Sequence, residues 1–351
     1  MDKNKILLVS SDESVFTQPC RYALEKLGYV LDYFNYRADL YFKNKLVRRL
    51  YRTIPGAKHL LKNRINRNFF KKVDSFGPDY VFALRAEHLL PEFLKKLKAR
   101  DIITFNWSSE DIWPGPDKGW GINVRLASSY DFFFVMDPHL LRQLKQSGFE
   151  NCYYLPFCAD VNEQTSNPFQ NRKEKYDIAM VASYSVSDYS NRTKYMESIK
   201  DLRLNIFGSA AWQKSSLKDC YRGTVTPDKV PDIYRHAKMV PNIHYDKTGS
   251  ESEGINLRPF EAMAAGALLI SDDSRAEMSK LFRAGEEFIS FPTGNYEKFR
   301  ELCKYYLDHS QERLQIAQNG YQSIIANHSY IKRMRQMMDI VESSINTNTC
   351  R

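Results

Sequence analysis

The chain has 351 residues, of which 43% are hydrophobic and 13% aromatic, a composition typical of a folded protein long enough for two domains. It contains no run of about 18 apolar residues, which excludes a membrane-spanning helix, and its first residues lack the apolar core of a signal peptide, so we expect a cytoplasmic protein. The six cysteines form no C-x-x-C pair, which argues against a zinc or disulfide framework.

Apolar runs of strand length alternate with helix-like segments through the first half of the chain. The expected strands are 6–10, 29–34, 80–84, 102–106, 132–136 and 153–156, and the expected helices lie near 13–27, 39–72, 89–100, 120–129 and 138–148. The strands are continuously hydrophobic, which indicates a parallel sheet covered on both faces. The alternation predicts a doubly wound α/β domain over residues 1–162.

A strongly basic stretch lies within this first domain. The net charge is +9, and no acidic residue occurs between Asp39 and Asp74, where lysines and arginines interleave with apolar residues. Residues 40–72 are therefore a candidate surface for an anionic membrane or a phosphorylated acceptor. The alternative is a solvated helical face that packs its apolar side on the sheet. No nucleic-acid-binding motif accompanies the charge, so we expect no nucleic-acid partner.

The same rhythm restarts after a polar stretch at 162–175, which we interpret as a linker. The expected strands are 177–182, 204–207, 239–243, 267–271 and 288–291, and the expected helices lie near 191–200, 227–237, 259–265, 274–283 and 295–308. They predict a second doubly wound domain over residues 163–328. Two further helices are expected near 310–326 and 329–345.

The segment from Gly254 to Ile270 combines a short Ala-rich helix with polar groups at its start. Pro259 and Glu261 suit a first helical turn, and Gly266 suits the stop before the next strand. Asn256, Arg258 and Glu261 would then lie where a helix N-terminus favours phosphate, with a carboxylate suited to a ribose diol. An ordinary helix–strand unit in which Glu261 only caps the helix is the alternative.

This segment, EGINLRPFEAMAAGALLISD, resembles the donor-site segment of group 1 nucleotide-sugar glycosyltransferases, in particular the spore-maturation (CgeB-like) branch. The segments ITFNWSSEDIW, YDFFFVMDPHLLRQLKQSGFENCYYLPFCAD and YDIAMVASYS follow the order that such enzymes show, so the resemblance covers roughly residues 75–335. It implies the GT-B fold, with two Rossmann-like domains facing across a cleft and a C-terminal helix, 329–351, that crosses back to the first domain.

The donor would be a nucleotide-diphosphate sugar, whose leaving charge needs cations or a metal. No Asp-x-Asp occurs, which disfavours a metal, and we expect no cofactor beyond the donor. Arg258 is the leading diphosphate ligand, with Arg192 and Lys194 as a second source. Glu261 is expected on the ribose, with Asn256 and Gly254 beside it. His244 follows a strand toward the same place, and a structural role for it is equally consistent.

Glu253 and Glu261 have the Glu-x7-Glu spacing of related retaining enzymes, with Glu253 near the donor sugar, although aligning the glycine favours Glu251 instead. An inverting enzyme would need a general base, for which Glu110 and Asp111 are the candidates, followed by Asp12 and Glu13. A helix cap at 108–111 is the alternative there. Likewise, the tryptophans at 107, 113 and 120 suit either stacking on sugar rings or packing.

We therefore predict a metal-independent and retaining glycosyltransferase, of the hexosyltransferase type, which acts on a hydroxyl acceptor. The acceptor would be a surface polysaccharide, a lipid-linked glycan or a protein, and the enzyme would be cytoplasmic or peripheral on the inner face of the membrane. A nucleotide-sugar epimerase and a non-catalytic binding protein of the same fold are the alternatives. Product analysis and nucleotide binding distinguish them.

Overall fold

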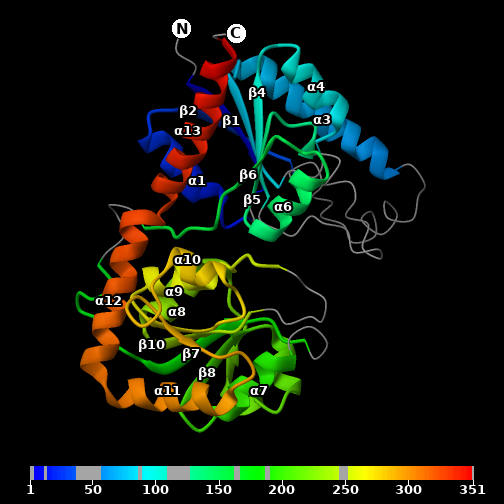
Figure 1. The fold of residues 1–351 in the computed structure, drawn as a ribbon. Coiled ribbons are helices and arrows are strands. Elements are labelled where there is room, and N and C mark those ends of the chain that lie inside the picture. Colours follow the sequence, from blue (N-terminus) through cyan, green and yellow to red (C-terminus); the bar gives the residue numbers. More distant parts are fainter. Residues whose placement is uncertain are drawn as a thin grey trace. The chain divides into compact units, whose positions relative to one another are not determined.

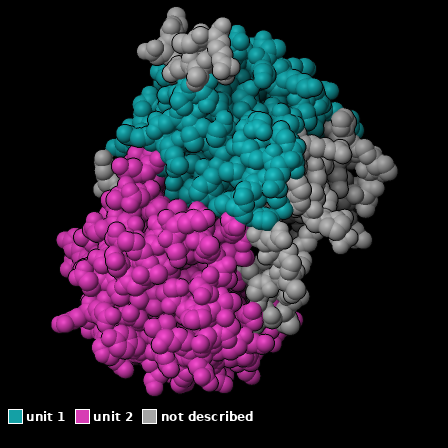
Figure 2. Space-filling model, viewed as in Figure 1, with its two compact units in different colours: residues 1–156, 333–351 teal, residues 157–332 magenta. Residues whose placement is uncertain are grey.

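The protein forms two compact units, each built on one parallel β-sheet (Figures 1 and 2). Unit 1 comprises residues 1–156 and 333–351, and unit 2 comprises residues 157–332. The computed structural model describes residues 4–11, 14–36, 57–85, 89–108, 127–161, 167–185, 190–244 and 252–349. None of the helices in these ranges is both long and apolar enough to cross a membrane.

Unit 1 contains a six-stranded sheet in the order β2-β1-β3-β4-β5-β6, with every neighbouring pair parallel. Its elements are β1 (Lys5–Ser10), α1 (Thr17–Lys26), β2 (Val30–Asn35), α3 (Ala57–Phe76), β3 (Tyr80–Leu84), α4 (Pro91–Lys98), β4 (Ile103–Ser108), β5 (Phe132–Val135), α6 (Pro138–Gln146), β6 (Cys152–Tyr154) and the larger part of α13 (Tyr330–Thr349).

Alternate residues of the buried strands of unit 1 face opposite sides of its sheet, because side chains along a strand alternate. Leu7 and Val9 of β1 share one core with buried residues of α3, α4 and α6. On the other side lie α1 and α13 (Figure 1). There, the hydroxyl of Tyr29 donates a hydrogen bond of 2.6 Å to Glu342 of α13. Both faces of the sheet are therefore covered, as its continuous hydrophobicity predicts.

Unit 2 contains the second six-stranded parallel sheet, in the order β12-β11-β10-β7-β8-β9. Its elements are β7 (Tyr176–Ala182), α7 (Ser190–Ser198), β8 (Leu204–Gly208), β9 (Tyr221–Gly223), α8 (Val230–Arg235), β10 (Ala237–Asn242), α9 (Arg258–Ala264), β11 (Leu268–Asp272), α10 (Glu277–Leu281), β12 (Ile289–Phe291), α11 (Tyr296–Asp308) and α12 (Ser310–Asn327). Short 3-10 turns lie at Ala210–Lys214, Lys218–Cys220 and Pro227–Lys229. Helix α7 packs with α11, and α8 and α12 both pack with α9 (Figure 1).

Two expectations from the sequence need correction, and one strand was missed. The helix expected at 39–72 occupies Ala57–Phe76 within the described residues, so it continues four residues past its predicted end. The helix expected at 227–237 is a 3-10 turn followed by the shorter α8. Strand β9 was not expected, because its three residues at the sheet edge carry no apolar run.

The polar stretch predicted to be a linker is held against unit 2 in its described part, 167–175. The guanidinium of Arg172 donates hydrogen bonds to the carbonyl oxygens of Ala237 and Gly266, at the amino ends of β10 and β11. Gly266 ends α9 with a φ of 72°, as its predicted role as a helix stop requires. A Cβ at this glycine would lie 2.8 Å from a terminal nitrogen of Arg172. The linker therefore packs at the edge of the sheet opposite to the candidate site.

Candidate functional site

The candidate site lies at the carboxyl ends of β7 and β10, where the strand order of unit 2 reverses. From β7 the chain runs outward through β8 and β9, then returns to the other side of β7 with β10 and continues to β11 and β12. In open α/β sheets, ligands bind beyond the carboxyl ends of the strands at such a switch point. The polar residues that follow these two strands are therefore the ones to consider first.

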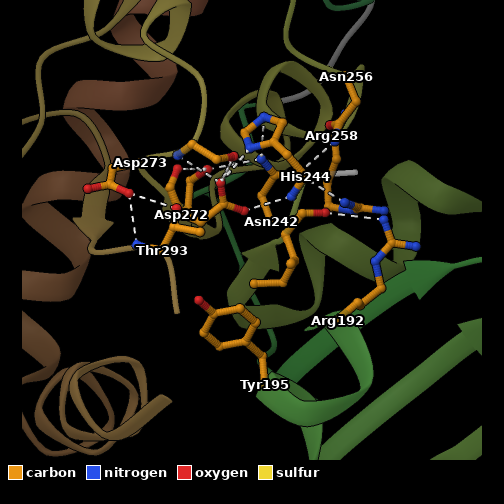
Figure 3. Close-up of polar contacts among 12 residues, drawn as sticks. Arg192, Tyr195, Asn242, His244, Asn256, Arg258, Asp272, Asp273 and Thr293 are labelled. Carbon is orange, nitrogen blue, oxygen red and sulfur yellow. Dashed lines mark hydrogen bonds and ion pairs between the residues drawn. The ribbon is translucent and has the colours of Figure 1, made fainter. Parts of the chain in front are cut away.

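Asn242, the last residue of β10, is at the centre of the polar cluster in Figure 3 and is fully buried. Its Oδ1 accepts hydrogen bonds from Asn256 Nδ2 at 3.0 Å and from Arg258 Nη1 at 2.9 Å. Its Nδ2 lies 3.0 Å from the hydroxyl oxygen of Ser271 and 3.1 Å from Nε2 of His244. All the hydrogen-bonding capacity of this buried amide is thus used within the cluster.

His244 and Asp272 form a buried pair beside Asn242 (Figure 3). Nδ1 of His244 lies 3.0 Å from Oδ1 of Asp272, and the backbone N–H of His244 donates to Oδ2 at 2.6 Å. The side chain of Ser274 also donates to Oδ1. Burial by itself would raise the pKa of Asp272, but the hydrogen bonds from His244 and Ser274 outweigh it and lower this pKa to about 2.

Arg258, the first residue of α9, joins the carboxyl ends of β7 and β10. Its Nη1 donates to Asn242, and its Nη2 donates to the backbone carbonyl of Val181 at 3.0 Å. Its Nε is buried and makes no hydrogen bond within the described ranges. The backbone N–H of Arg258 donates to Oδ1 of Asn256 at 3.1 Å. The guanidinium is therefore fixed in place by two neighbouring strands, and hydrogen atoms remain on both terminal nitrogens.

Glu261 lies one turn into α9, as predicted. Its carboxyl group is mostly buried and makes no hydrogen bond to any described residue. Burial raises its pKa from the ordinary value of 4.5 to about 7, and the nearby charge of Arg258 only partly offsets this effect. A carboxyl group in this state can bind hydroxyl donors of a ligand and become ionised when it does so.

Arg192, on the first turn of α7, also contacts the ends of both strands. Its two terminal nitrogens donate to the carbonyl oxygens of Ser183, at 3.2 Å, and Ile243, at 3.1 Å, and the side chain is buried. Lys194, two residues further along, is exposed, and its amino group has no partner in the described part of the chain. The two predicted cations therefore differ, since Arg192 is held by backbone carbonyls whereas Lys194 is open to solvent.

The remaining predicted residues are less closely connected with this cluster. Glu253 and Gly254 are partly buried in the coil that leads into α9. Trp107 is buried, and its indole N–H donates to the carbonyl of Leu155 at 3.1 Å, so it packs within unit 1. Glu110 and Asp111, and with them Asp12, Glu13, Glu251, Trp113 and Trp120, lie outside the described residues. Among those that are described, no three His, Cys, Asp or Glu side chains are grouped as a metal site would require.

Asp272 is the residue of this cluster that sequence reasoning missed as a partner of His244. In the structure, β10 and β11 are parallel neighbours in which Asn242 pairs with Ser271. The residues that follow these two strand positions therefore lie at the same edge of the sheet, which brings the end of β11 close to His244. Without the strand order, however, the adjacency of β10 and β11 was not available from the sequence.

Four comparisons show what this chain is similar to. Residues 192–339 match a family described as glycosyl transferase-like. The chain is 21% identical over 316 residues to the spore protein CgeB of Bacillus subtilis strain 168, a match that covers 85% of this chain and 90% of that protein. Sucrose-phosphate synthase from Thermosynechococcus elongatus has a similar fold, with a TM-score of 0.68 and 12% identity over 98% of this chain and all of that one.

Anabaena HepE, solved in complex with UDP, is similar with a TM-score of 0.60 and 12% identity, over 97% of this chain and 100% of that chain. The resemblance and the GT-B fold predicted from the sequence are thereby confirmed.

Proposed function

We propose that this chain, in which residues 192–339 match a glycosyl transferase-like family and which has the GT-B fold, transfers a sugar from a nucleotide-diphosphate sugar to a hydroxyl group of an acceptor, with the donor held at the carboxyl edge of the unit 2 sheet. The observation that carries this proposal is the convergence of Asn256 and Arg258 on the ends of β7 and β10, at the switch point of the sheet, with Glu261 in the first turn of the helix that Arg258 begins. Unit 2 thus contains the whole of the donor site that we propose.

Each polar group has a task that suits its surroundings. Glu261, which makes no hydrogen bond to a described residue, would accept hydrogen bonds from the ribose hydroxyls. Arg258 and Lys194 would neutralise the charge of the diphosphate as the glycosidic bond breaks. Arg192 would add positive charge to the same region from α7, where its guanidinium is bonded to the residues that follow β7 and β10. With cations in this position the reaction would need no metal, and activity should survive addition of a chelator.

Two stereochemical outcomes remain to be distinguished, and we propose the retaining one. It would place Glu253 near the donor sugar, whereas an inverting enzyme would use Glu110 or Asp111 as the base that removes a proton from the acceptor hydroxyl. The anomeric configuration of the product, read by NMR, decides between them.

Nucleotide binding is the direct test of the donor site. The protein would be titrated by calorimetry with UDP, GDP, dTDP, ADP and CMP, and UDP comes first because HepE was solved with UDP and with UDP-glucose. We expect one nucleoside diphosphate to bind, and the variant Glu261→Gln to bind it more weakly while keeping its fold. If none of the five binds to the folded protein, the proposal is wrong and a non-catalytic role is favoured. Interconversion of the donor without an acceptor would indicate an epimerase.

For the acceptor side, we propose that unit 1 attaches to an anionic membrane surface on the cytoplasmic side, so that a lipid-linked or surface glycan is within reach. The exposed side of α3 carries Leu60, Arg64, Arg67 and Lys71, which recur every three or four residues and so share one face of the helix. Leu60 is 69% exposed, and none of the three cations forms an ion pair among the residues that the structure describes.

Helix α4 extends this surface. It packs beside α3 through Phe70 and Phe93, whose ring centroids are 5.3 Å apart, and it adds the exposed Lys95 and Lys96, neither of which forms an ion pair with a described residue. Membrane-surface helices typically combine cations with an exposed apolar residue in this way. Each cation near an anionic surface contributes about 1 kcal/mol, screened by salt.

Sedimentation with vesicles that contain an anionic phospholipid tests this attachment. We expect binding at low salt that the double variant Arg64→Glu/Arg67→Glu abolishes. The matched control is Lys214→Glu/Lys218→Glu, which makes the same charge change at two exposed lysines of unit 2. If the wild-type protein does not bind at low salt, or if both variants lose binding equally, this surface is not a membrane contact.

A further inference from the structure

A buried chain of polar side chains leads from Asp272 through His244 to Asn242, and no donor contact proposed above uses its first two members. We infer that His244, held by Asp272, positions Arg258 and Asn256 for the donor by restraining the side-chain amide of Asn242. This inference rests on the proposed function, since it assigns positioning residues to the same site. The three residues of the chain are each at most 4% exposed.

The orientation of the Asn242 amide follows from its partners on the donor side. Arg258 Nη1 can only donate a hydrogen bond. Asn256 also donates to Asn242, because its own Oδ1 already accepts from the backbone N–H of Arg258. Both neighbours therefore require the oxygen of Asn242 to face them, and its NH2 group must point the other way.

The tautomer of His244 follows from that orientation. The NH2 group of Asn242 donates to Nε2 of His244, which must then carry no proton. The proton of the neutral ring is on Nδ1 instead, where it is donated to Asp272 over 3.0 Å. Asp272 is itself held by the backbone N–H groups of His244 and Ser274. The hydrogen bond from one ring nitrogen of a histidine commonly determines which nitrogen carries the proton. Here the carboxylate of Asp272, which faces Nδ1, selects the form of His244 with its proton on Nδ1.

The consequence for the donor site is that the side-chain oxygen of Asn242 is fixed in position as a hydrogen-bond acceptor. With its NH2 group bound to His244 and Ser271, Asn242 presents one oxygen to Arg258 and Asn256. If Nε2 of His244 carried the proton instead, two hydrogen-bond donors, this N–H and the NH2 group of Asn242, would face each other. Rotating the Asn242 amide by half a turn would remove this conflict, but it would point the NH2 group at Arg258, which is also a donor. Arg258 would then lose its bond to Asn242, although its bond to Val181 would remain. Preorganisation of such groups determines how well they bind charge.

The tautomer can be observed directly in the intact protein. Long-range 1H–15N correlation spectra of protein labelled with 15N-histidine distinguish Nδ1–H from Nε2–H rings, and the chain has seven histidines. The signal that disappears in His244→Asn is assigned to His244. We expect the Nδ1–H form. An Nε2–H ring or an imidazolium at pH 7.5 would overturn the inference, whether or not the protein binds nucleotides.

Two variants separate positioning from a merely structural role. The amide of an asparagine occupies the place of Nδ1 in a histidine ring, and the amide of a glutamine occupies that of Nε2. His244→Asn can therefore still donate to Asp272 but offers Asn242 no acceptor. His244→Gln offers Asn242 the acceptor oxygen but loses the contact with Asp272.

We expect His244→Gln to bind UDP within about threefold of the wild type and His244→Asn to bind it at least about tenfold more weakly, as expected for loss of a restraint on one charged hydrogen bond. Thermal stability should follow the opposite order, because His244→Asn keeps the bond to the buried carboxylate. If UDP affinity follows stability, or if both variants bind like the wild type, His244 is only structural. If the wild-type protein binds no nucleoside diphosphate, the proposed function fails, and the tautomer alone decides the inference.

Discussion

At the scale of single residues, burial of the Glu261 carboxyl group lowers the free energy of unfolding at neutral pH. Its carboxyl group has a pKa raised by burial to about 7, above the ordinary 4.5 of an unfolded chain. The folded protein therefore binds a proton more tightly than the unfolded one, and the stability that this adds below about pH 4.5 is lost as the pH rises to about 7. A mostly buried carboxyl group that makes no hydrogen bond to a described residue is typical of a binding residue rather than a stabilising one.

The variant Glu261→Gln tests this cost, because glutamine does not titrate. Between pH 4.5 and pH 8, the free energy of unfolding of Glu261→Gln relative to the wild type should increase by about 3 kcal/mol. Urea unfolding of both proteins at several pH values measures this difference. A difference that does not change with pH would contradict the raised pKa.

Donor binding should depend on the same proton. Ribose hydroxyls donate to the ionised carboxylate, so binding has to remove the proton that Glu261 carries below pH 7. We expect the affinity for UDP-glucose to rise by up to about tenfold per pH unit from pH 5 to 7 and to level off above. UDP-glucose is the suitable ligand, since its diphosphate does not titrate in this range. Calorimetric titrations should show this slope for the wild type and a flat profile for Glu261→Gln.

The residues of the proposed donor site were named from residue type and spacing, but their contacts could not be predicted in this way. Arg258 and Asn256 were expected from the motif, and both lie at the ends of the strands. That Arg258 bonds to Val181, 77 residues earlier in the chain, follows from the adjacency of β7 and β10, which spacing along the chain does not reveal. The pairing of His244 with Asp272 was missed for the same reason, since it depends on the neighbouring strand β11.

At the scale of elements, the fold followed from hydrophobic patterning because the central strands of both sheets are buried on both faces. Strand β3 was predicted with the observed bounds, Tyr80–Leu84, and all five of its residues are buried. Strand β9 lies at the sheet edge with its residues partly or fully exposed, so no apolar run marks it. Pattern-based prediction succeeds where burial dictates the residue type and fails at such edges.

A glycine inside α12 shows packing that a helical pattern does not predict. A Cβ at Gly320 would lie 2.5 Å from the carbonyl oxygen of Glu287 and 3.1 Å from the sulfur of Met263 on α9. Alanine normally stabilises a helix by about 1 kcal/mol relative to glycine. Here we expect Gly320→Ala to destabilise unit 2 by about 1–3 kcal/mol, because the backbone of Glu287 has to move.

The control for this prediction is Gln322→Ala, an exposed position of the same helix with no side-chain partner among the described residues. It should change the free energy of unfolding by less than about 0.5 kcal/mol. Thermal and urea unfolding compare the two variants. If Gly320→Ala were as stable as this control, the close approach of Gly320 to Glu287 and Met263 would be wrong.

At the scale of the whole molecule, the chain passes from unit 1 to unit 2 once and returns once. Residues 333–351 belong to unit 1 although they follow all of unit 2 in the sequence. Helix α13 carries the return, with Met334, Met337 and Val341 fully buried and Glu342 bonded to Tyr29. Unit 1 therefore requires both ends of the chain, whereas unit 2 is continuous and contains the donor site that we propose.

Each unit has a buried core of its own, so calorimetry should resolve two unfolding transitions. A substitution in the core of one unit should then lower the temperature of only that unit's transition. Met337 of α13 and Met180 of β7 are both fully buried, and replacing either with alanine should cost about 2–5 kcal/mol. We expect Met337→Ala to lower one transition and Met180→Ala to lower the other. A ligand at 100 times its dissociation constant stabilises its folded unit by about 2.7 kcal/mol, so UDP should raise only the transition that Met180→Ala lowers. If UDP raised the transition sensitive to Met337→Ala instead, the donor would bind to unit 1, against the placement proposed here.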